Sequence, residues 1–313
     1  MKHVLIPIGC RSDEGLSAPV IKRLQKEDWC EVKIVRLEPQ DFMCSYQIMD
    51  IACKAKNHVG VYNQKKPDLV FITGDRVEMC AAAAAAFHNK VKIAHFYGGV
   101  VNDPKTTYDD TDRDVISLWA DIHFVESCNA AWKVHKLKGY HSEYFKVCSK
   151  LQSLGIHIVG ISHLDDLEVD ELLVPRLKDP VGISYIDNLK SGDLIQKYDL
   201  LLLNKEIYSY NFAGYSKCLD RLQIQIGGNP DGIVEPQEGA IYYENLPRAQ
   251  FFGLLKNCQR FITNSSCAIY EAPHFIKPEQ IVWVGDRNRN RARGPFQTGA
   301  SDKIVTILKE YLK

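Results

Sequence analysis

The stretch DLVFITGDRVEMCAAAAAAFHNKVKIAHFYGG, residues 68–99, decides the fold class of this 313-residue chain. Residues 68–73 form an apolar run closed by a glycine, which predicts a buried strand. The alanine-rich run 77–88 predicts a helix that packs closely on a sheet. A second apolar run, 92–96, predicts another strand closed by paired glycines. Strand, helix and strand in this order indicate a parallel sheet with right-handed crossovers.

The same alternation continues on both sides of this unit. The further predicted strands are 3–8, 31–37, 122–126, 200–203, 260–263 and 280–284, and the further predicted helices are 17–26, 112–120, 212–222, 247–257, 267–274 and 302–312. This pattern predicts an α/β protein made of two Rossmann-like domains with parallel sheets and a ligand cleft between them. We expect the domains at 1–155 and 156–300, with a closing helix at 301–313 that packs back toward the first domain.

Composition narrows the class of protein. Hydrophobic residues make up 45% and charged residues 25% of the chain, which is typical of a globular protein. Lys plus Arg and Asp plus Glu both number 39, so no net charge attracts nucleic acid. No apolar stretch approaches the roughly 20 residues that span a bilayer. Ten cysteines include no Cys-x-x-Cys pair, which argues against a structural zinc site and favours free thiols in a reducing cytoplasm.

Two turns at predicted strand ends in the first half carry groups suited to ligand contact. Ligands of parallel sheets collect at the carboxyl ends of the strands. Arg11 follows the first strand at a helix start, where it could contact a phosphate. Asp75, Arg76 and Glu78 follow the third strand. Each turn also has a plain structural interpretation: an ordinary strand–helix turn for the first, and a helix N-cap with a surface ion pair for the second.

An acidic cluster occupies residues 109–114, where four carboxylates surround Arg113 at a predicted helix start. Acidic residues there complement the helix dipole, which is the structural interpretation. The functional interpretation is that one of them acts as an acid or base on a bound substrate. The spacing does not indicate a metal cluster, although Mg²⁺ stays an open alternative.

The second half carries two polar turns. Asn264, Ser265 and Ser266 lie between a predicted strand and helix, where small hydroxyl groups and free amides cradle a diphosphate well. Glu271 on the same helix could hold both hydroxyls of a ribose. Four arginines at alternate positions follow the last predicted strand: Arg287, Arg289, Arg291 and Arg293. They suggest phosphate contacts, or alternatively a solvated basic loop.

Together these motifs resemble the UDP-N-acetylglucosamine 2-epimerase family, most closely its hydrolysing branch. In chain order the matching motifs are Gly9-x-Arg11 with Gly15-Leu16, Gly74-Asp75-Arg76-x-Glu78, His95-x-x-Gly98-Gly99, Asp109-Asp110-x-x-Arg113, Asn264-Ser265-Ser266 with Glu271-Ala272-Pro273, and Gly285-Asp286-Arg287 with Arg291. The resemblance implies a glycosyltransferase-B-like fold, a UDP-binding second domain, a UDP-sugar substrate between the domains, no cofactor and a homodimer.

The resemblance also implies roles for residues. UDP contacts would come from Arg11, Asn264, Ser265, Ser266, Glu271, Arg287 and Arg291. Catalysis would depend on Asp75, Asp110, Glu78 and Arg113, and the sugar would face His95, Tyr97 and Gly99. The family reaction removes the C2 proton and expels UDP from C1, leaving a 2-acetamidoglucal to which water adds. It needs a base near C2, an acid near the glycosidic oxygen and positive charge on the leaving diphosphate.

The chain departs from the family pattern at acid–base positions. Tyr97 and Val100 stand where the family usually has a glutamate, and Asp114 stands where the hydrolysing branch has a histidine. The strand at 200–203 runs into Asn204, with no histidine there. Two alternatives to the epimerase therefore stay open. One is a UDP-sugar-dependent glycosyltransferase, which needs an acceptor and no C2 base, and the other is a catalytically inactive nucleotide-sugar binder.

Overall fold

The structure, a computed structural model, describes residues 1–38, 41–54, 66–100, 108–139, 151–167, 169, 198–203, 222–227, 239–244, 246–285, 288 and 296–313. The chain divides into two compact units, Met1–Asp165 with Asn290–Lys313, and Asp166–Arg289. The sequence predicts the corresponding domain boundaries near residues 155 and 300. No helix in these ranges is long and apolar enough to cross a membrane.

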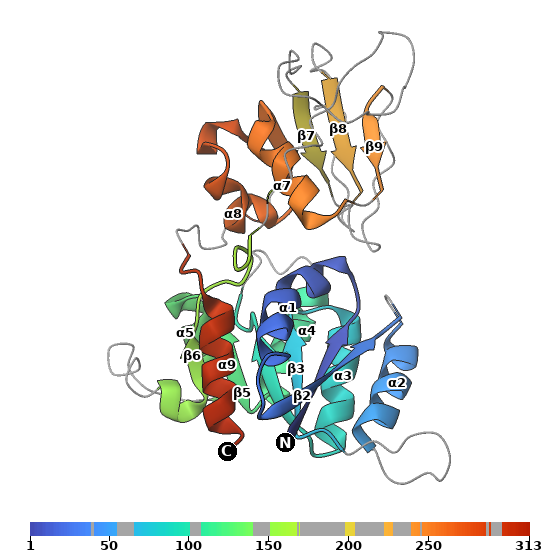
Figure 1. Cartoon of the computed structure of the whole chain (residues 1–313), viewed down its shortest axis with the longest axis vertical. Coiled ribbons are helices and arrows are strands. Elements are labelled where there is room, and N and C mark those ends of the chain that lie inside the picture. Colours follow the sequence, from blue (N-terminus) through green and yellow to red (C-terminus); the bar gives the residue numbers. More distant parts are fainter. Residues whose placement is uncertain are drawn as a thin grey trace. The chain divides into compact units, whose positions relative to one another are not determined.

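A six-stranded parallel sheet forms the centre of the first unit, in the order β2-β1-β3-β4-β5-β6 (Figure 1). Its strands are β1 (Lys2–Ile8), β2 (Cys30–Arg36), β3 (Leu69–Thr73), β4 (Lys92–Phe96), β5 (Ile122–Val125) and β6 (Ile156–Ile158). In this order β2 lies on one side of β1 and β3 lies on the other side. The point between β1 and β3 is therefore a topological switch point, where open α/β sheets bind ligands.

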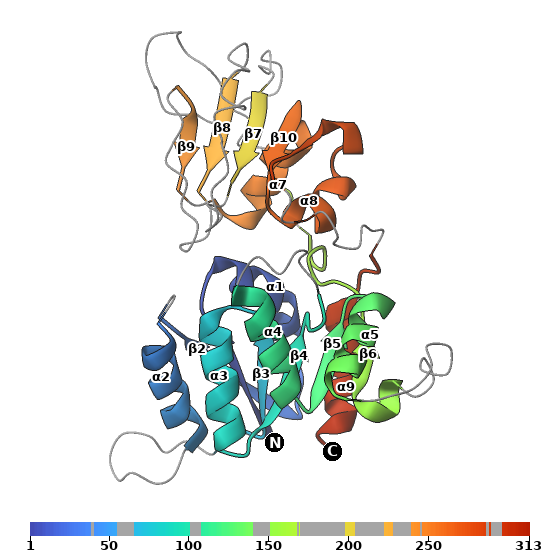
Figure 2. The ribbon, with the colours of Figure 1, turned by 180° about the vertical axis from the view of Figure 1, so that it is seen from behind.

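Helices cover both faces of this sheet. They are α1 (Arg11–Leu24), α2 (Phe42–Lys54), α3 (Val77–His88), α4 (Tyr108–Trp119), α5 (Cys128–Leu137) and α9 (Ala300–Tyr311), with a 3₁₀ turn at Gln152–Leu154. Helices α1 and α9 pack together on one face, and α2 to α5 lie side by side on the other (Figures 1 and 2). The six alanines of α3 are almost wholly buried, so their small side chains let this helix lie close to the sheet.

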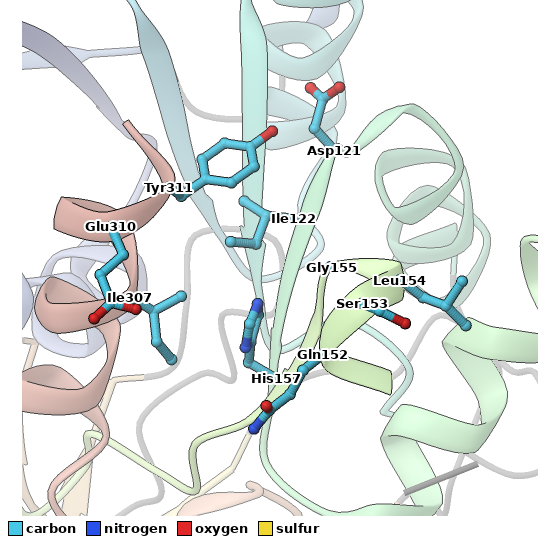
Figure 3. Close-up of a pocket in the computed structure, with 10 residues that line it drawn as sticks. All are labelled: Asp121, Ile122, Gln152, Ser153, Leu154, Gly155, His157, Ile307, Glu310 and Tyr311. Carbon is cyan, nitrogen blue, oxygen red and sulfur yellow. The ribbon is translucent and has the colours of Figure 1, made fainter. Parts of the chain in front are cut away.

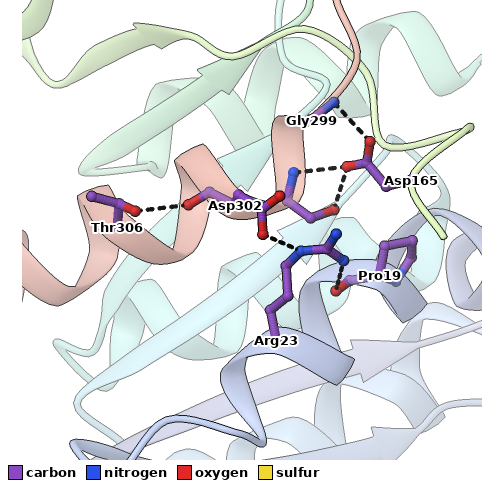
Figure 4. A network of polar contacts seen from close by, with 7 residues as sticks. Pro19, Arg23, Asp165, Gly299, Asp302 and Thr306 are labelled. Atoms are coloured by element: carbon purple, nitrogen blue, oxygen red, sulfur yellow. Dashed lines mark hydrogen bonds and ion pairs between the residues drawn. The ribbon is translucent and has the colours of Figure 1, made fainter.

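Helix α9 is fastened to the first unit by Asp165 and Arg23 (Figure 4). The Asp165 carboxylate accepts hydrogen bonds from the amides of Gly299 and Ser301, at 2.7 and 2.9 Å, and from the Ser301 hydroxyl at 2.7 Å. A carboxylate at this position caps the helix start and complements its dipole. Arg23 pairs with Asp302, the residue after Ser301 in the first turn of α9.

The second unit contains a five-stranded parallel sheet in the order β11-β10-β7-β8-β9. Its elements are β7 (Tyr198–Leu202), β8 (Leu222–Ile226), β9 (Ile241–Tyr243), α7 (Arg248–Asn257), β10 (Arg260–Thr263), α8 (Cys267–Tyr270), β11 (Ile281–Trp283) and 3₁₀ turns at Ala272–His274 and Pro278–Gln280. Tyr198, Phe252 and Phe261 are buried in its core. Two parallel-sheet halves confirm the predicted fold class.

Several element predictions need correction. The helix predicted from residue 17 begins at Arg11, because Asp13 caps the turn before it. The helix predicted at 267–274 is broken into α8 and a 3₁₀ turn that contains Pro273. Of the helix predicted at 212–222, only residue 222 lies in the described ranges, and it begins β8. Strand β8 was not predicted.

Candidate active site

The turn from β1 into α1 is closed by Asp13. Its buried carboxylate accepts hydrogen bonds from the amides of Gly9 and Cys10, at 3.2 and 3.0 Å. Burial raises the pKa of Asp13 to about 6, opposed by the nearby Arg76 guanidinium. This cap places Arg11 at the first position of α1 with its side chain exposed. Arg11 therefore lies at the carboxyl edge of the sheet, beside the switch point.

Asp75 follows β3 on the other side of the switch point and forms a cluster with two residues of α4. The Arg113 guanidinium pairs with the Asp75 carboxylate through one nitrogen. Its other terminal nitrogen lies 3.0 Å from Asp110 and donates to the carbonyl of Val100 at 2.8 Å. The side chains of Arg113, Asp110 and Asp75 are 5%, 0% and 19% exposed. Of the three, Asp75 has the most exposed side chain.

Glu78 lies on the first turn of α3 and has no exposed surface. It pairs with the buried Arg76 at 3.1 Å. A side chain on Gly9 would meet Glu78, since an added Cβ would lie 3.2 Å from its Cβ. The Arg76–Glu78 pair is therefore packed beneath the β1 turn. Asp114, where the family histidine was expected, pairs with Lys133 of α5 at 2.8 Å.

His95, near the end of β4, joins two strand ends. Its Nε2 lies 2.8 Å from the carbonyl of Gly74 and its Nδ1 lies 2.9 Å from the Ser117 hydroxyl. Because a carbonyl can only accept, Nε2 carries the proton and Nδ1 accepts from the serine. Complete burial lowers the pKa of His95 to about 4, so the ring is neutral near pH 7. His95 thereby fixes the Gly74 turn that carries Asp75.

Tyr97 and Gly99 follow β4 in the left-handed backbone region, with φ of 66° and 75°. A Cβ on Gly99 would lie 2.2 Å from the carbonyl oxygen of Ala130, so this glycine allows α5 to approach. The Tyr97 hydroxyl is buried against Ser162 and lies 3.0 Å from Nδ1 of His163. Sequence reasoning missed His163, whose only signal was a histidine in the segment that follows β6.

The serine turn, residues 264–266 of the second unit, follows β10. The Ser265 amide donates to the Thr263 hydroxyl at 2.9 Å, and Ser266 occupies the N-cap position of α8. The side-chain amide of Asn288 donates to the carbonyl of Asn264 at 2.7 Å. Asn288, which follows β11, therefore contacts the serine turn. Arg287 and Arg291 lie outside the described residues.

Glu271 ends α8 and is nearly buried. Burial raises the pKa of its carboxyl group, and the Arg248 guanidinium opposes this shift. Arg248 lies 2.9 Å from the carboxylate and stacks over the Phe252 ring at 5.0 Å. Sequence reasoning missed Arg248, because a basic residue in the first turn of a helix carries no distinctive signal.

The structure thus places Asp75, Asp110, Arg113 and Glu78 around the ends of β1, β3 and β4, and the serine turn with Asn288 in the second unit. The joint action of the two groups on one ligand stays a prediction. A separate open cavity of about 560 Å³ lies at the amino ends of β5 and β6, and none of the predicted site residues lines it (Figure 3). In the described ranges, no group of three His, Cys, Asp or Glu side chains could hold a metal ion.

Comparisons with known proteins bear on the family of this chain. The model of a family described as UDP-N-acetylglucosamine 2-epimerase matches residues 51–177. A UDP-N-acetylglucosamine 2-epimerase of Campylobacter jejuni is 31% identical, over 90% of this chain and 81% of its own. A hydrolysing UDP-N,N'-diacetylbacillosamine 2-epimerase of Legionella pneumophila is 28% identical, over 100% of this chain and 89% of its own.

A solved structure shares the fold across both units. The UDP-GlcNAc 2-epimerase of Methanocaldococcus jannaschii, in complex with UDP-GlcNAc and UDP, superposes with a TM-score of 0.66 at 16% identity. The match covers 99% of this chain and 100% of that one. The resemblance inferred from the motifs is confirmed, and the chain belongs to the UDP-N-acetylglucosamine 2-epimerase family of nucleotide-sugar enzymes.

Proposed function

We propose that this nucleotide-sugar 2-epimerase follows the hydrolysing route on a UDP-N-acetylhexosamine, releasing UDP and the C2-epimeric free sugar. The observation that carries the proposal is the Asp75–Arg113 ion pair, which leaves one carboxylate partly exposed at the switch point. Relatives named as hydrolysing 2-epimerases, one of them 28% identical over the whole chain, support the same route.

Asp75 is the proposed C2 base. It pairs with Arg113 and is the partly exposed carboxylate that we propose accepts the C2 proton. The electron pair of the C2–H bond then forms the C1–C2 double bond, and the C1–O bond breaks with its electrons going to UDP. General base catalysis contributes about 10²–10⁴-fold to such a step.

Asp110, Arg113, Glu78 and His95 act as positioning residues on this proposal. Asp110 orients Arg113 from behind, and both are buried. Breaking such a buried charge pair costs about 3–5 kcal/mol, because it leaves an uncompensated buried charge. We propose that His95 supports the Asp75 turn and does not touch the sugar, since both of its ring nitrogens are already hydrogen-bonded.

The UDP side of the proposal rests on the second unit. The serine turn and its amides would hold the diphosphate, and Glu271 would accept hydrogen bonds from the ribose hydroxyls. Arg248 pairs with that buried carboxylate and opposes the rise in its pKa that burial causes. Arg11, Arg287 and Arg291 would neutralise the leaving diphosphate.

The proposed partners are a UDP-sugar and water, and no acceptor is required. We also propose a homodimer, by resemblance to the family. A reducing cytoplasmic setting is supported by the cysteines within the described ranges, all of which are free thiols.

The test is a panel of UDP-hexosamines incubated with the enzyme without any acceptor, with release of UDP measured. The proposal expects UDP from at least one donor, and a loss of about 100-fold or more in Asp75→Asn. Asp28→Asn, a change at an exposed turn, is the matched control and should keep full activity. Release that depends on an added acceptor would instead identify a glycosyltransferase, and nucleotide binding without release would identify an inactive binder.

A further inference from the structure

We propose that the open cavity at the amino ends of β5 and β6 is a second ligand site, which binds an uncharged monosaccharide such as a free N-acetylhexosamine. The cavity lies at the opposite edge of the sheet from Asp75, which follows the carboxyl end of β3. It is therefore separate from the candidate active site. The inference goes beyond the proposed function and does not rest on it, because it concerns binding without turnover.

The walls of the cavity come from three parts of the first unit (Figure 3). Strands β5 and β6 contribute Ile122 and His157, the 3₁₀ turn at Gln152–Leu154 forms a second wall, and Ile307 and Tyr311 enter from the last turns of α9. The volume of about 560 Å³ lies within the range of small-molecule sites, about 300–1,000 Å³. The cavity is therefore large enough for a monosaccharide.

Backbone contacts fix the shape of the cavity. Gly155 has a φ of 72°, and an added Cβ would lie 2.8 Å from the carbonyl oxygen of Asp121. The Gly155 carbonyl accepts from the His123 amide at 2.7 Å. The Asp121 carboxylate accepts from the Ile93 amide at 2.8 Å through one oxygen. The turn and the Asp121 side chain are therefore already in place, and a preorganised site loses less entropy on binding.

Three polar groups at the cavity keep hydrogen-bonding capacity. Within the described part of the chain, the His157 ring and the Tyr311 hydroxyl have no hydrogen-bond partner, and the second carboxylate oxygen of Asp121 has none either. The His157 and Tyr311 side chains are half-buried. Burial lowers the pKa of His157, so its ring is neutral near pH 7 and offers one donor and one acceptor. A ligand with hydroxyl groups would satisfy these groups.

The charges around the cavity favour an uncharged ligand. Among the described residues that line it, the charged ones are Asp121 and Glu310, so a phosphate or carboxylate group would meet carboxylates. Lys92 lies 4.7 Å from the centroid of the Tyr311 ring. Lys138 donates at 2.8 Å to the carbonyl that precedes Asp121, whose charge raises the pKa of this lysine. The two ammonium groups offset the two carboxylates, so a cation gains little here either.

A sugar matches the mixture of donors and acceptors in the lining. Hydroxyl groups can donate to the Asp121 carboxylate and accept from the Gln152 amide or from His157, whereas phosphate oxygens only accept and an ammonium group only donates. The apolar side chains of Leu154 and Ile307 suit the C–H groups of the sugar ring and the methyl of an N-acetyl group. The lining therefore selects a monosaccharide over ionic ligands.

The test is methyl NMR of the isoleucine-labelled protein, titrated with free N-acetylmannosamine or N-acetylglucosamine in the absence of nucleotide. We expect the methyl signals of Ile122 and Ile307 to shift in a saturable manner with at least one of these sugars. Ile304 lies in the same helix but is fully buried and outside the lining, so its signal should not move. Because the readout is local, sugar bound at the candidate active site does not interfere.

Tyr311→Phe keeps the ring and removes the hydroxyl, so it should weaken sugar binding about fivefold. Thr306→Val, at an exposed position of α9 outside the lining, is the matched control and should bind sugar as the parent does. The inference is overturned if neither sugar shifts the Ile307 signal, if the two variants bind equally, or if only spermidine or a hexose phosphate shifts it. A parent that binds sugar here but releases no UDP from any donor would refute the proposed function and leave this inference intact.

Discussion

Neutral His95 should make the first unit sensitive to acid, and His95→Gln should remove that sensitivity. Glutamine can still donate to the carbonyl of Gly74, but it does not titrate. Burial lowers the pKa of His95 from 6.5 to about 4. The unfolded chain therefore binds more protons than the folded chain between these values, and stability falls as the pH falls below about 6.5. Between pH 7 and pH 5 this proton binding lowers the unfolding free energy by about 2 kcal/mol.

Other buried groups titrate in the same range. His123, in the next strand, is also buried and its pKa is lowered, so it adds to the loss of stability in acid. Burial raises the pKa of Asp13 to about 6, and a raised carboxyl pKa acts in the opposite direction, adding stability as the pH falls through that value. The parent curve alone therefore mixes opposing effects. The difference between parent and variant reports His95 together with its electrostatic effect on the neighbouring His123.

The assay is urea unfolding at pH 7 and pH 5, followed by tryptophan fluorescence. Three of the four tryptophans, Trp29, Trp119 and Trp132, lie in the first unit, so the signal reports mainly on that unit. We expect the parent to lose about 2 kcal/mol more than His95→Gln between the two pH values, with equal m-values. Parallel losses in the two proteins would refute the assignment of a buried neutral ring.

Three further predictions concern packing and ligand contact. Gly99→Ala should lower the unfolding free energy of the first unit by about 2 kcal/mol or more, because its Cβ would meet the carbonyl of Ala130 at 2.2 Å; unchanged urea midpoints would contradict this. Asp165→Ala should lower the unfolding free energy by about 1–2 kcal/mol, because it removes the cap of α9. Amide hydrogen exchange in α9 should then become faster, and unaltered exchange would contradict the capping role of Asp165. Asn288→Ala should weaken UDP binding about tenfold, as measured by calorimetry, because it removes one hydrogen bond worth about 1.4 kcal/mol. Equal affinity would contradict the proposed role of the serine turn in UDP binding.

Much of the fold could be predicted because its signals are local. The apolar runs of β3 and β4 and the alanines of α3 lie within single elements, and all three were placed within a residue or two. Strand β8 was missed because its sequence, LQIQI, interrupts the apolar run with glutamines. The structure buries Gln223 and Gln225, so the alternation did not mark a solvent-facing side.

The candidate site was predictable in part from the rule that ligands bind at the carboxyl ends of parallel strands. Asp75 and Arg113 lie on different elements, but the strand-end rule brings both to one edge of the sheet. That rule could not show that Asp110 is buried behind Arg113 while Asp75 reaches the surface. His163 could not be found either, because its contact with Tyr97 joins residues 66 positions apart and depends on the path of a connecting segment.

The most direct test of the central claim is NMR of the reaction in D₂O, with deuterium at C2 and free UDP scored separately. If Asp75 is the C2 base, the parent should give free UDP and an epimeric sugar fully deuterated at C2, and Asp75→Asn should give neither product at a comparable rate. An epimeric sugar that retains its original proton, or an Asp75→Asn variant with the parent rate of exchange, would contradict the account.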